Sequence, residues 1–155
     1  MNFNPDDIRT LAETVWEVTL AVPLTVDTSG QSSARGRSTV GSIQITGAWN
    51  GAVLLDCSTE VARKAAAAMF SSWPDSVSMQ DMQDAVAELV NIMGGNLKSL
   101  LPEKCYLSLP SVVEGGDYSA RVPGSRVVNR EEFSCDGHRV TITILERLGE
   151  DKRAA

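Results

Sequence analysis

The chain is poor in the residues from which most catalytic and metal sites are built. Its 155 residues include one histidine, His138, and three cysteines, Cys57, Cys105 and Cys135, with no Cys-x-x-Cys spacing. A zinc site needs several such ligands at short spacings, and an enzyme with its own nucleophile needs a Ser/His/Asp or Cys/His set. An odd number of cysteines without such spacing is typical of reduced thiols. We therefore expect a cytoplasmic protein with buried, reduced cysteines and no zinc site.

Positive charge and long apolar runs are also scarce. The chain has 14 Lys and Arg residues against 20 Asp and Glu, a formal net charge of −6, and no cluster of basic residues. Binding to a phosphate backbone needs such a cluster, so nucleic acid is not expected as a partner. No run of about 18 apolar residues exists to cross a membrane. The first ten residues, MNFNPDDIRT, are acidic where a signal peptide would be basic, so no signal peptide is expected.

The residues that are present predict one globular domain over residues 1–155, since 43% are hydrophobic and 22% are charged. Helical spacing and capping residues predict three helices: one from Asn4–Pro5–Asp6 to Pro23, one from Ser58 to about Phe70, and one over Met79–Pro102. Alternating or apolar runs predict six strands: Leu24–Thr28, Val40–Thr46, Ala52–Cys57, Cys105–Val113, Arg126–Cys135 and Arg139–Glu146.

The order of these elements indicates an internal duplication. A helix followed by three strands is predicted in a first half, about 5–57, and again in a second half, about 79–147, with the helix of about 59–70 between them. Two segments support the repeat locally, because Ala12–Trp16 (AETVW) resembles Ala87–Asn91 (AELVN). The two copies share the glutamate, Glu13 or Glu88. They differ three residues later, where the first copy has Trp16 and the second has Asn91.

The helix predicted over Met79–Pro102 has an unusual polar face. Its apolar residues fall in one arc at helical spacing: Met82, Val86, Leu89, Met93, Leu97 and Leu100. The opposite arc holds Asp84, Glu88, Asn91, Gly95 and Lys98. Such a face is ordinarily only a solvated surface, yet Gly94 and Gly95 each cost about 1 kcal/mol against alanine within a helix. A glycine one turn after Asn91 lets the surface of a partner come close.

Glu88-x-x-Asn91, followed by glycines, Lys98 and Pro102, resembles the signature of the CheC/CheX/FliY family of chemotaxis response-regulator phosphatases. The segment Gly47-Ala-Trp49-Asn-Gly51 before an apolar strand is also similar, and the resemblance covers about residues 8–146. CheC-type members carry the Glu-x-x-Asn pair on two helices and CheX-type members on one, so Trp16 makes this chain most similar to the CheX branch. The resemblance implies an α+β fold, a pseudo-twofold repeat of a helix plus three antiparallel strands. Two long helices would pack on a mainly antiparallel six-stranded sheet, with one connecting helix.

The resemblance also implies a function in two-component signalling: hydrolysis of the aspartyl phosphate of a CheY-like receiver. Asn91 would position the attacking water, and Glu88 would form an ion pair with the receiver's active-site lysine. Asp84, Gly95 and Lys98 would contact the partner around them. No cofactor of the chain's own is implied, because the Mg²⁺ would belong to the receiver, and no covalent intermediate is needed. Relatives of the CheX type imply a homodimer paired through sheet edges.

Other interpretations of these residues remain open at this point. The same fold would serve a receiver-binding or scaffold module that hydrolyses nothing. Glu13 is expected to be structural or vestigial because Trp16 leaves it without a partner, and Trp16 is expected in the core or an interface. The three methionines of the long helix, Met79, Met82 and Met93, are expected to fill the core, and His138 is expected on the exposed side of a strand.

Overall fold

The computed structural model describes residues 3–28, 36–101, 103–116 and 123–149. The helices within these ranges are α1 (Pro5–Leu20), α2 (Thr59–Met69), the 3₁₀ helix η1 (Pro74–Ser76) and α3 (Met79–Lys98). The strands are β1 (Thr25–Val26), β2 (Arg37–Gly47), β3 (Gly51–Ser58), β4 (Cys105–Leu107), β5 (Ser111–Gly116), β6 (Ser125–Cys135) and β7 (His138–Arg147). The three predicted helices are confirmed, and the differences lie at their ends.

Helix α1 begins where the sequence predicts and ends earlier. The Asn4 side chain accepts a hydrogen bond of 2.9 Å from the backbone N–H of Asp6, which satisfies one of the free amides of the first turn. The predicted end at Pro23 is wrong. The helix stops at Leu20 because Ala21 adopts a left-handed conformation with φ 57°, and its N–H donates to the Glu17 carbonyl.

Helix α3 has a capped N-terminus and is followed by a 3₁₀-type turn. Ser78 and Asp81 form a reciprocal capping box, with hydrogen bonds of 3.1 and 3.0 Å between each side chain and the other residue's backbone N–H. The helix ends at Lys98 rather than continuing toward Pro102, which lies outside the described residues. Beyond that point the amides of Leu100 and Leu101 donate to carbonyls three residues back. This tighter turn leaves Leu100 47% exposed, so its predicted place in the apolar arc is wrong.

The sheet has seven strands in six positions, in the order β1-β6-β7-β3-β2-β4, with β5 also paired to β2. All the described pairings are antiparallel. The prediction of six strands is corrected at one place, because the run Cys105–Val113 is divided into β4 and β5. Pro110, which has no N–H to donate, lies in the interruption. Both pieces pair with the same edge of β2.

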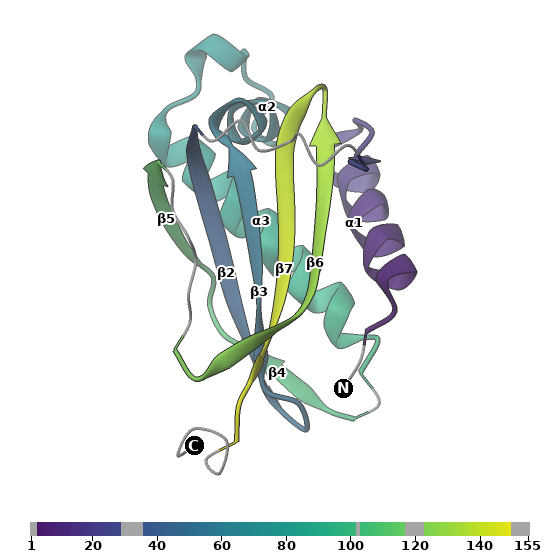
Figure 1. The fold of residues 1–155 in the computed structure, drawn as a ribbon. Coiled ribbons are helices and arrows are strands. Elements are labelled where there is room, and N and C mark those ends of the chain that lie inside the picture. The colour runs from purple at the N-terminus through teal and green to yellow at the C-terminus, as the bar shows by residue number, and fades with distance from the viewer. Residues whose placement is uncertain (1–2, 29–35, 102, 117–122, 150–155) are drawn as a thin grey trace.

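The predicted repeat is confirmed, with the first strand of each half exchanged. The hairpins β2–β3 and β6–β7 meet at the centre through the β3–β7 pairing. Strand β1 of the first half pairs with β6 of the second, while β4 and β5 of the second half pair with β2 of the first. Each half therefore completes the sheet edge of the other. The helices lie together on one face of this sheet, behind it in Figure 1.

The main core lies between the helices and the sheet. Trp16 is fully buried there, as are the three free cysteines, and both predictions are confirmed. Met82 and Met93 are also buried, but Met79 is 45% exposed, so its predicted core position is wrong. It is the first residue of α3, at the exposed end of the helix next to the cap residue Ser78. His138 is half-buried rather than exposed at the start of β7.

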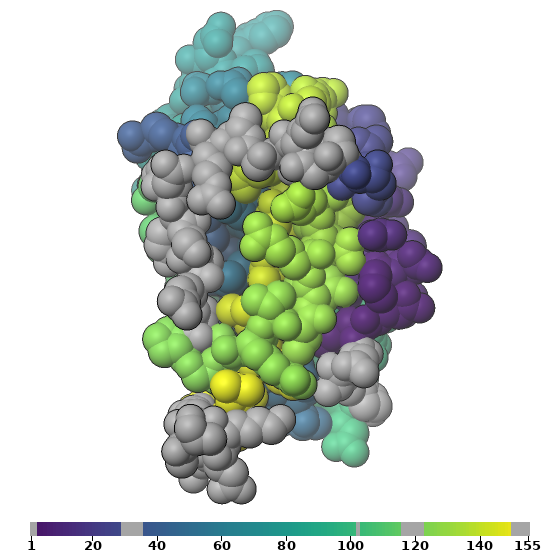
Figure 2. Space-filling view, in the orientation of Figure 1, coloured from purple at the N-terminus to yellow at the C-terminus, as the bar shows by residue number. Residues whose placement is uncertain are grey.

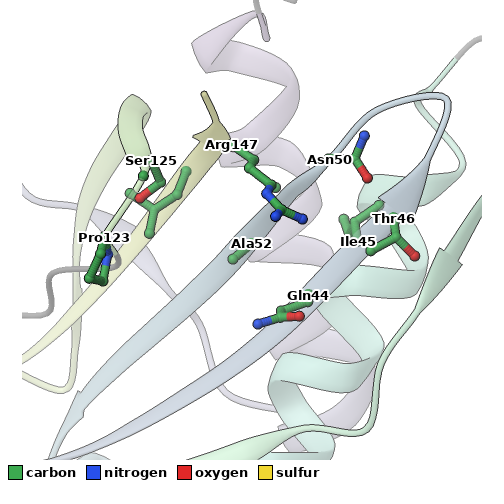
Figure 3. A pocket seen from close by; sticks show the side chains of 11 residues that line it. Gln44, Ile45, Thr46, Asn50, Ala52, Pro123, Ser125 and Arg147 are labelled. Atoms are coloured by element: carbon green, nitrogen blue, oxygen red, sulfur yellow. The ribbon is translucent and has the colours of Figure 1, made fainter. Parts of the chain in front are cut away.

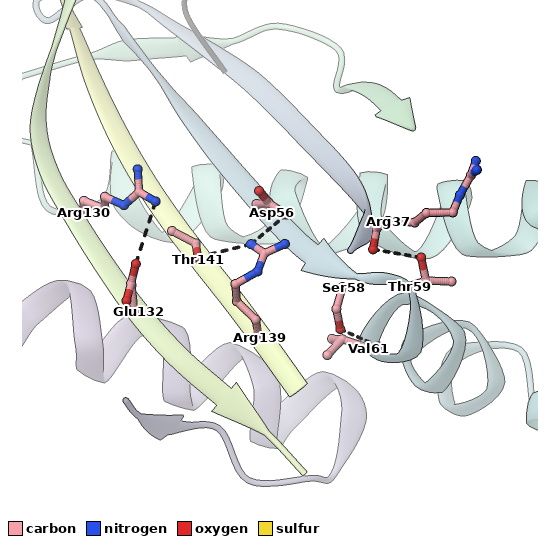
Figure 4. A network of polar contacts seen from close by, with 9 residues as sticks. All are labelled: Arg37, Asp56, Ser58, Thr59, Val61, Arg130, Glu132, Arg139 and Thr141. Carbon is pink, nitrogen blue, oxygen red and sulfur yellow. Dashed lines mark hydrogen bonds and ion pairs between the residues drawn. The ribbon is translucent and has the colours of Figure 1, made fainter. Parts of the chain in front are cut away.

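The opposite face of the sheet, which faces the viewer in Figure 2, carries charged side chains on its central strands (Figure 4). Arg139 Nη1 lies 3.1 Å from Asp56 Oδ1, joining β7 to β3, and Arg130 pairs with Glu132 at 3.8 Å on β6. A small apolar cluster of Ala52, Leu54 and Leu145 is buried on this side. No helix within the described residues is long and apolar enough to span a membrane.

Candidate functional site

The polar face of α3 points away from the core, as its spacing predicts. Its buried stripe consists of Met82, Ala85, Val86, Leu89, Val90, Met93, Gly94 and Leu97. On the other side Asp84, Glu88 and Gly95 are exposed, while Asn91 and Lys98 are half-buried. The five candidate residues thus share one accessible surface on one rigid element. We call this surface the α3 face.

Glu88 and Asn91 have no side-chain partner among the described residues, unlike Asp84 and Asn96 on the same helix. The Asp84 carboxylate accepts a hydrogen bond of 2.8 Å from Gln80 Nε2, and Asn96 Nδ2 donates to the Ile92 carbonyl at 2.8 Å. The Glu88 carboxylate and the Asn91 carboxamide make neither a hydrogen bond nor an ion pair within the described part of the chain. A carboxamide both donates and accepts, so Asn91 offers a full set of hydrogen-bonding groups to an incoming molecule.

The arrangement of charges on the α3 face slightly lowers the stability of the helix. Asp84 and Glu88 are four residues apart, a spacing at which like charges repel and destabilise a helix by a few tenths of a kcal/mol. Lys98 is nearly three turns further on and cannot offset that pair directly. The arrangement leaves a negative site at Glu88 that suits a cationic side chain of a partner.

The two glycines of α3 have different roles. Gly94 is buried against β2, where a Cβ atom would lie 2.9 Å from Ile43 Cγ2. Gly95 faces open space, with no atom within 4 Å of a Cβ placed there. Gly41 on β2 makes the matching approach, because its Cβ would lie 2.9 Å from Val86 Cγ1. A helix held this close to the strand is a firm base for the side chains on its outer face.

Sequence reasoning treated Gly94 and Gly95 as one feature and missed the packing role of Gly94 and Gly41. A signal for Gly41 was present, because a glycine inside a strand often marks a close approach of another element. Helical spacing also separates the two glycines of α3, because Gly95 falls in the polar arc with Asn91 while Gly94 lies one turn from Val90 and Leu97, which are buried.

The Gly47–Gly51 segment, which contributed to the family resemblance, has a structural role and is not part of the α3 face. It forms the β2–β3 turn, where the Trp49 indole N–H donates to Glu146 Oε2 at 2.8 Å. Arg126 Nη2 holds the other oxygen at 2.8 Å. The hydrogen bond from Arg126, followed by that from Trp49, lowers the pKa of Glu146 to about 2. At Gly51 a Cβ would overlap the Trp49 ring, so only glycine fits this turn.

The cysteines offer no nucleophile to the candidate site. Burial raises the pKa of the Cys57 and Cys135 thiols, so both stay protonated and weakly reactive. Within the described ranges no cluster of three or more His, Cys, Asp and Glu side chains is placed to hold a metal ion.

The first half of the repeat has no equivalent of the α3 face. Glu13 is exposed on α1 as Glu88 is on α3. Trp16, the counterpart of Asn91, is instead directed into the core and has no exposed surface. The repeat therefore presents one Glu-x-x-Asn pair rather than two.

Comparison with solved structures identifies the fold. The CheX protein of Vibrio vulnificus is 20% identical, with a TM-score of 0.76 over 91% of this chain and 95% of that one. The CheX protein of Desulfovibrio desulfuricans is 24% identical, with a TM-score of 0.71 over 91% and 97% of the two chains. CheX of Borrelia burgdorferi, solved as a complex with CheY, BeF₃ and Mg²⁺, is 16% identical with a TM-score of 0.63 over 93% and 97%.

The sequence profile of the family described as chemotaxis phosphatase CheX matches residues 39–134, which is more than half of the chain. No curated protein matches the sequence. The matched region contains β3, α3 and nearly all of β2 and β6, and so includes the whole α3 face. The chain belongs to the CheX family of chemotaxis phosphatases.

Proposed function

We propose that this protein hydrolyses the aspartyl phosphate of a CheY-like receiver, acting in the cytoplasm. The observation that carries the proposal is the partnerless pair Glu88 and Asn91 on the accessible side of α3, with open space at Gly95 one turn further on. Membership of the CheX family supports it, as does the complex of the Borrelia burgdorferi relative with CheY.

Asn91 is the residue to which we assign the chemical step. Its carboxamide would hold a water molecule in line with the phosphorus atom, so that the enzyme contributes mainly positioning. The water oxygen forms a bond to phosphorus, and the bond from phosphorus to the receiver's aspartate oxygen breaks. The products are inorganic phosphate and a free aspartate carboxylate, with no covalent intermediate on this chain. The Mg²⁺ ion would be the receiver's, and this chain would need no cofactor of its own.

Glu88 is the residue to which we assign docking. An exposed carboxylate without an internal partner is well suited to the active-site lysine of a receiver, and such a pair fixes the orientation of the complex. Gly95 would leave room for the receiver's surface. Asp84 and Lys98 lie at the two ends of the α3 face and would form contacts at its rim.

Adding this protein to a phosphorylated receiver is expected to shorten the lifetime of the phosphate, measured as released inorganic phosphate. Glu88→Ala should weaken binding about tenfold or more, because it leaves the receiver's lysine without its partner. The rate within the saturated complex should change less. Glu13→Ala, which removes the equivalent exposed carboxylate from α1, is the matched control and should leave both quantities unchanged.

Two results would contradict these assignments. If Glu88→Ala binds like the parent while Asp84→Ala loses affinity, the docking carboxylate is Asp84. If the parent binds the receiver and leaves its phosphate lifetime unchanged, the protein is a receiver-binding or scaffold module rather than a phosphatase.

We also propose a homodimer joined through sheet edges. Strand β1 pairs with only two residues of β6, Phe133 and Ser134, so β1 leaves the remainder of the β6 edge uncovered. Open strand edges favour pairing with another chain. Light scattering after gel filtration should give about twice the mass of the 16.6 kDa chain. A single-chain mass at high protein concentration would rule the dimer out.

A further inference from the structure

A pocket of about 290 Å³ lies on the face of the sheet opposite the helices, at the ends of β2, β3 and β7 (Figure 3). Its floor contains Ala52 and Leu145, which are buried at 7% and 4% exposure. Pro123 and Ser125 line one side, at the start of β6. Neither the proposed phosphatase reaction nor receiver docking uses any of these residues.

Arg147 provides the charge in this pocket. Its guanidinium extends toward Asn50 and over the strand that carries Ala52 (Figure 3). Among the described residues it forms no ion pair or side-chain hydrogen bond. The adjacent acid, Glu146, cannot neutralise it, because successive side chains of a strand point to opposite faces and Glu146 is held by Trp49 and Arg126 on the helix side.

The other groups in the pocket are compatible with an anion. None of its eleven lining residues is Asp or Glu. Gln44 and Thr46 project from β2 into the same space, and neither side chain has a hydrogen-bond partner among the described residues. The pocket therefore combines, above an apolar floor, a guanidinium, a carboxamide and a hydroxyl that have no side-chain partner within the described ranges. A local positive site of this kind contrasts with a chain whose net charge is −6.

We propose that this pocket binds a small organic oxyanion with an apolar body. A guanidinium forms paired hydrogen bonds with either a carboxylate or a phosphate ester, because both present two oxygens at matching spacing. Gln44 and Thr46 add neutral donors, and the Ala52–Leu145 floor accommodates the apolar part of the ligand. Pockets of roughly 300 Å³ with such a mixture of groups are at the lower end of the range for small-molecule sites.

Strand β2 connects this pocket with the α3 face. Gln44 and Thr46 line the pocket from one side of β2, while Gly41 and Ile43 on its other side touch α3 at Val86 and Gly94. A ligand that shifts β2 would also displace α3, because close-packed contacts transmit such a movement from the strand to the helix. The pocket is therefore placed to act as an effector site, and its occupancy can be tested without any receiver.

Four probes test the pocket by amide chemical-shift changes in the full-length protein: benzoate, benzamide, phenyl phosphate and inorganic phosphate. We expect benzoate or phenyl phosphate to shift the amides of Gln44, Thr46 and Arg147, and the tighter of the two identifies the anion as a carboxylate or a phosphate ester. Benzamide, which lacks the charge, and inorganic phosphate, which lacks the apolar body, should each bind at least about tenfold more weakly.

Arg147→Gln should lower the affinity for the tighter-binding probe about tenfold or more. Arg147→Lys should recover only part of that loss, because an ammonium group lacks the forked geometry of a guanidinium. Arg130→Gln is the matched control: it removes an exposed arginine from the same sheet face, outside the pocket, and should change affinity less than twofold. Equal weakening by Arg130→Gln would overturn the proposal in favour of non-specific charge attraction. Absence of shifts at millimolar probe, or equal binding of inorganic phosphate and the organic probes, would also overturn it.

Discussion

Asn91→Ala is expected to lower the rate of receiver dephosphorylation within the complex by about 100-fold or more. The reason is positional: without the carboxamide, the attacking water is no longer held in line with phosphorus, and misplacement of a reacting group by about 1 Å costs a factor of this size. Binding should persist, because the docking carboxylate of Glu88 lies one turn earlier and is unchanged. The measurement is single-turnover release of phosphate at saturating protein.

The matched control is Asn96→Ala on the same helix. Asn96 is an exposed asparagine whose amide donates to the Ile92 carbonyl of its own helix. Its loss removes the same chemical group from α3 without touching the proposed site, and the rate should stay within about twofold of the parent. Circular dichroism should show that both variants are folded. If Asn91→Ala keeps the activity of the parent, the assignment of the water-positioning role to Asn91 is wrong.

Trp16→Asn is expected to destabilise the protein by about 4 kcal/mol and to create no second active site. The change recreates Glu-x-x-Asn on α1 in sequence, with Glu13 already exposed. In the structure the new carboxamide would lie where the fully buried indole is packed, leaving a large cavity and burying a polar group. The measurement is the free energy of unfolding from urea denaturation, with phosphatase activity assayed at a temperature where the variant is folded.

Two further variants separate the core effect from the site effect. Trp16→Phe, which keeps most of the apolar volume, should lose less stability than Trp16→Asn, and Glu13→Ala on the surface should change stability by less than about 0.5 kcal/mol. A gain in activity by Trp16→Asn, or unfolding free energies equal to the parent, would show that position 16 can face a partner as Asn91 does.

Periodicity was enough to predict the helices and most strands, because burial of one face imposes a regular spacing on the residues of each element. It failed where local geometry decides. The end of α1 depends on one left-handed residue, Ala21. The division between β4 and β5 depends on the interruption at Pro110 within an otherwise strand-like run. Neither event changes the hydrophobic pattern enough to be recognised beforehand.

The sequence predicted which residues form the candidate site, but not which of their side chains have hydrogen-bond partners. Spacing alone places Glu88, Asn91 and Gly95 on one face of a helix. Whether their side chains are already engaged depends on neighbours, and the contrast between free Asn91 and self-bonded Asn96 appears only in three dimensions. The pocket at Arg147 could not be predicted from the sequence at all, because its residues come from separate strands and no linear motif joins them.

The duplication, the helical register and the single Glu-x-x-Asn pair can be read from the sequence, since each of these follows from residue spacing within one segment. Three other features appear only in the folded protein: the first strands of the two halves exchange partners, Gly94 packs against Ile43 of β2, and Trp16 fills the core. These outcomes depend on contacts between residues far apart in the chain. Local spacing carries little information about such contacts because they are selected by the packing of the whole core.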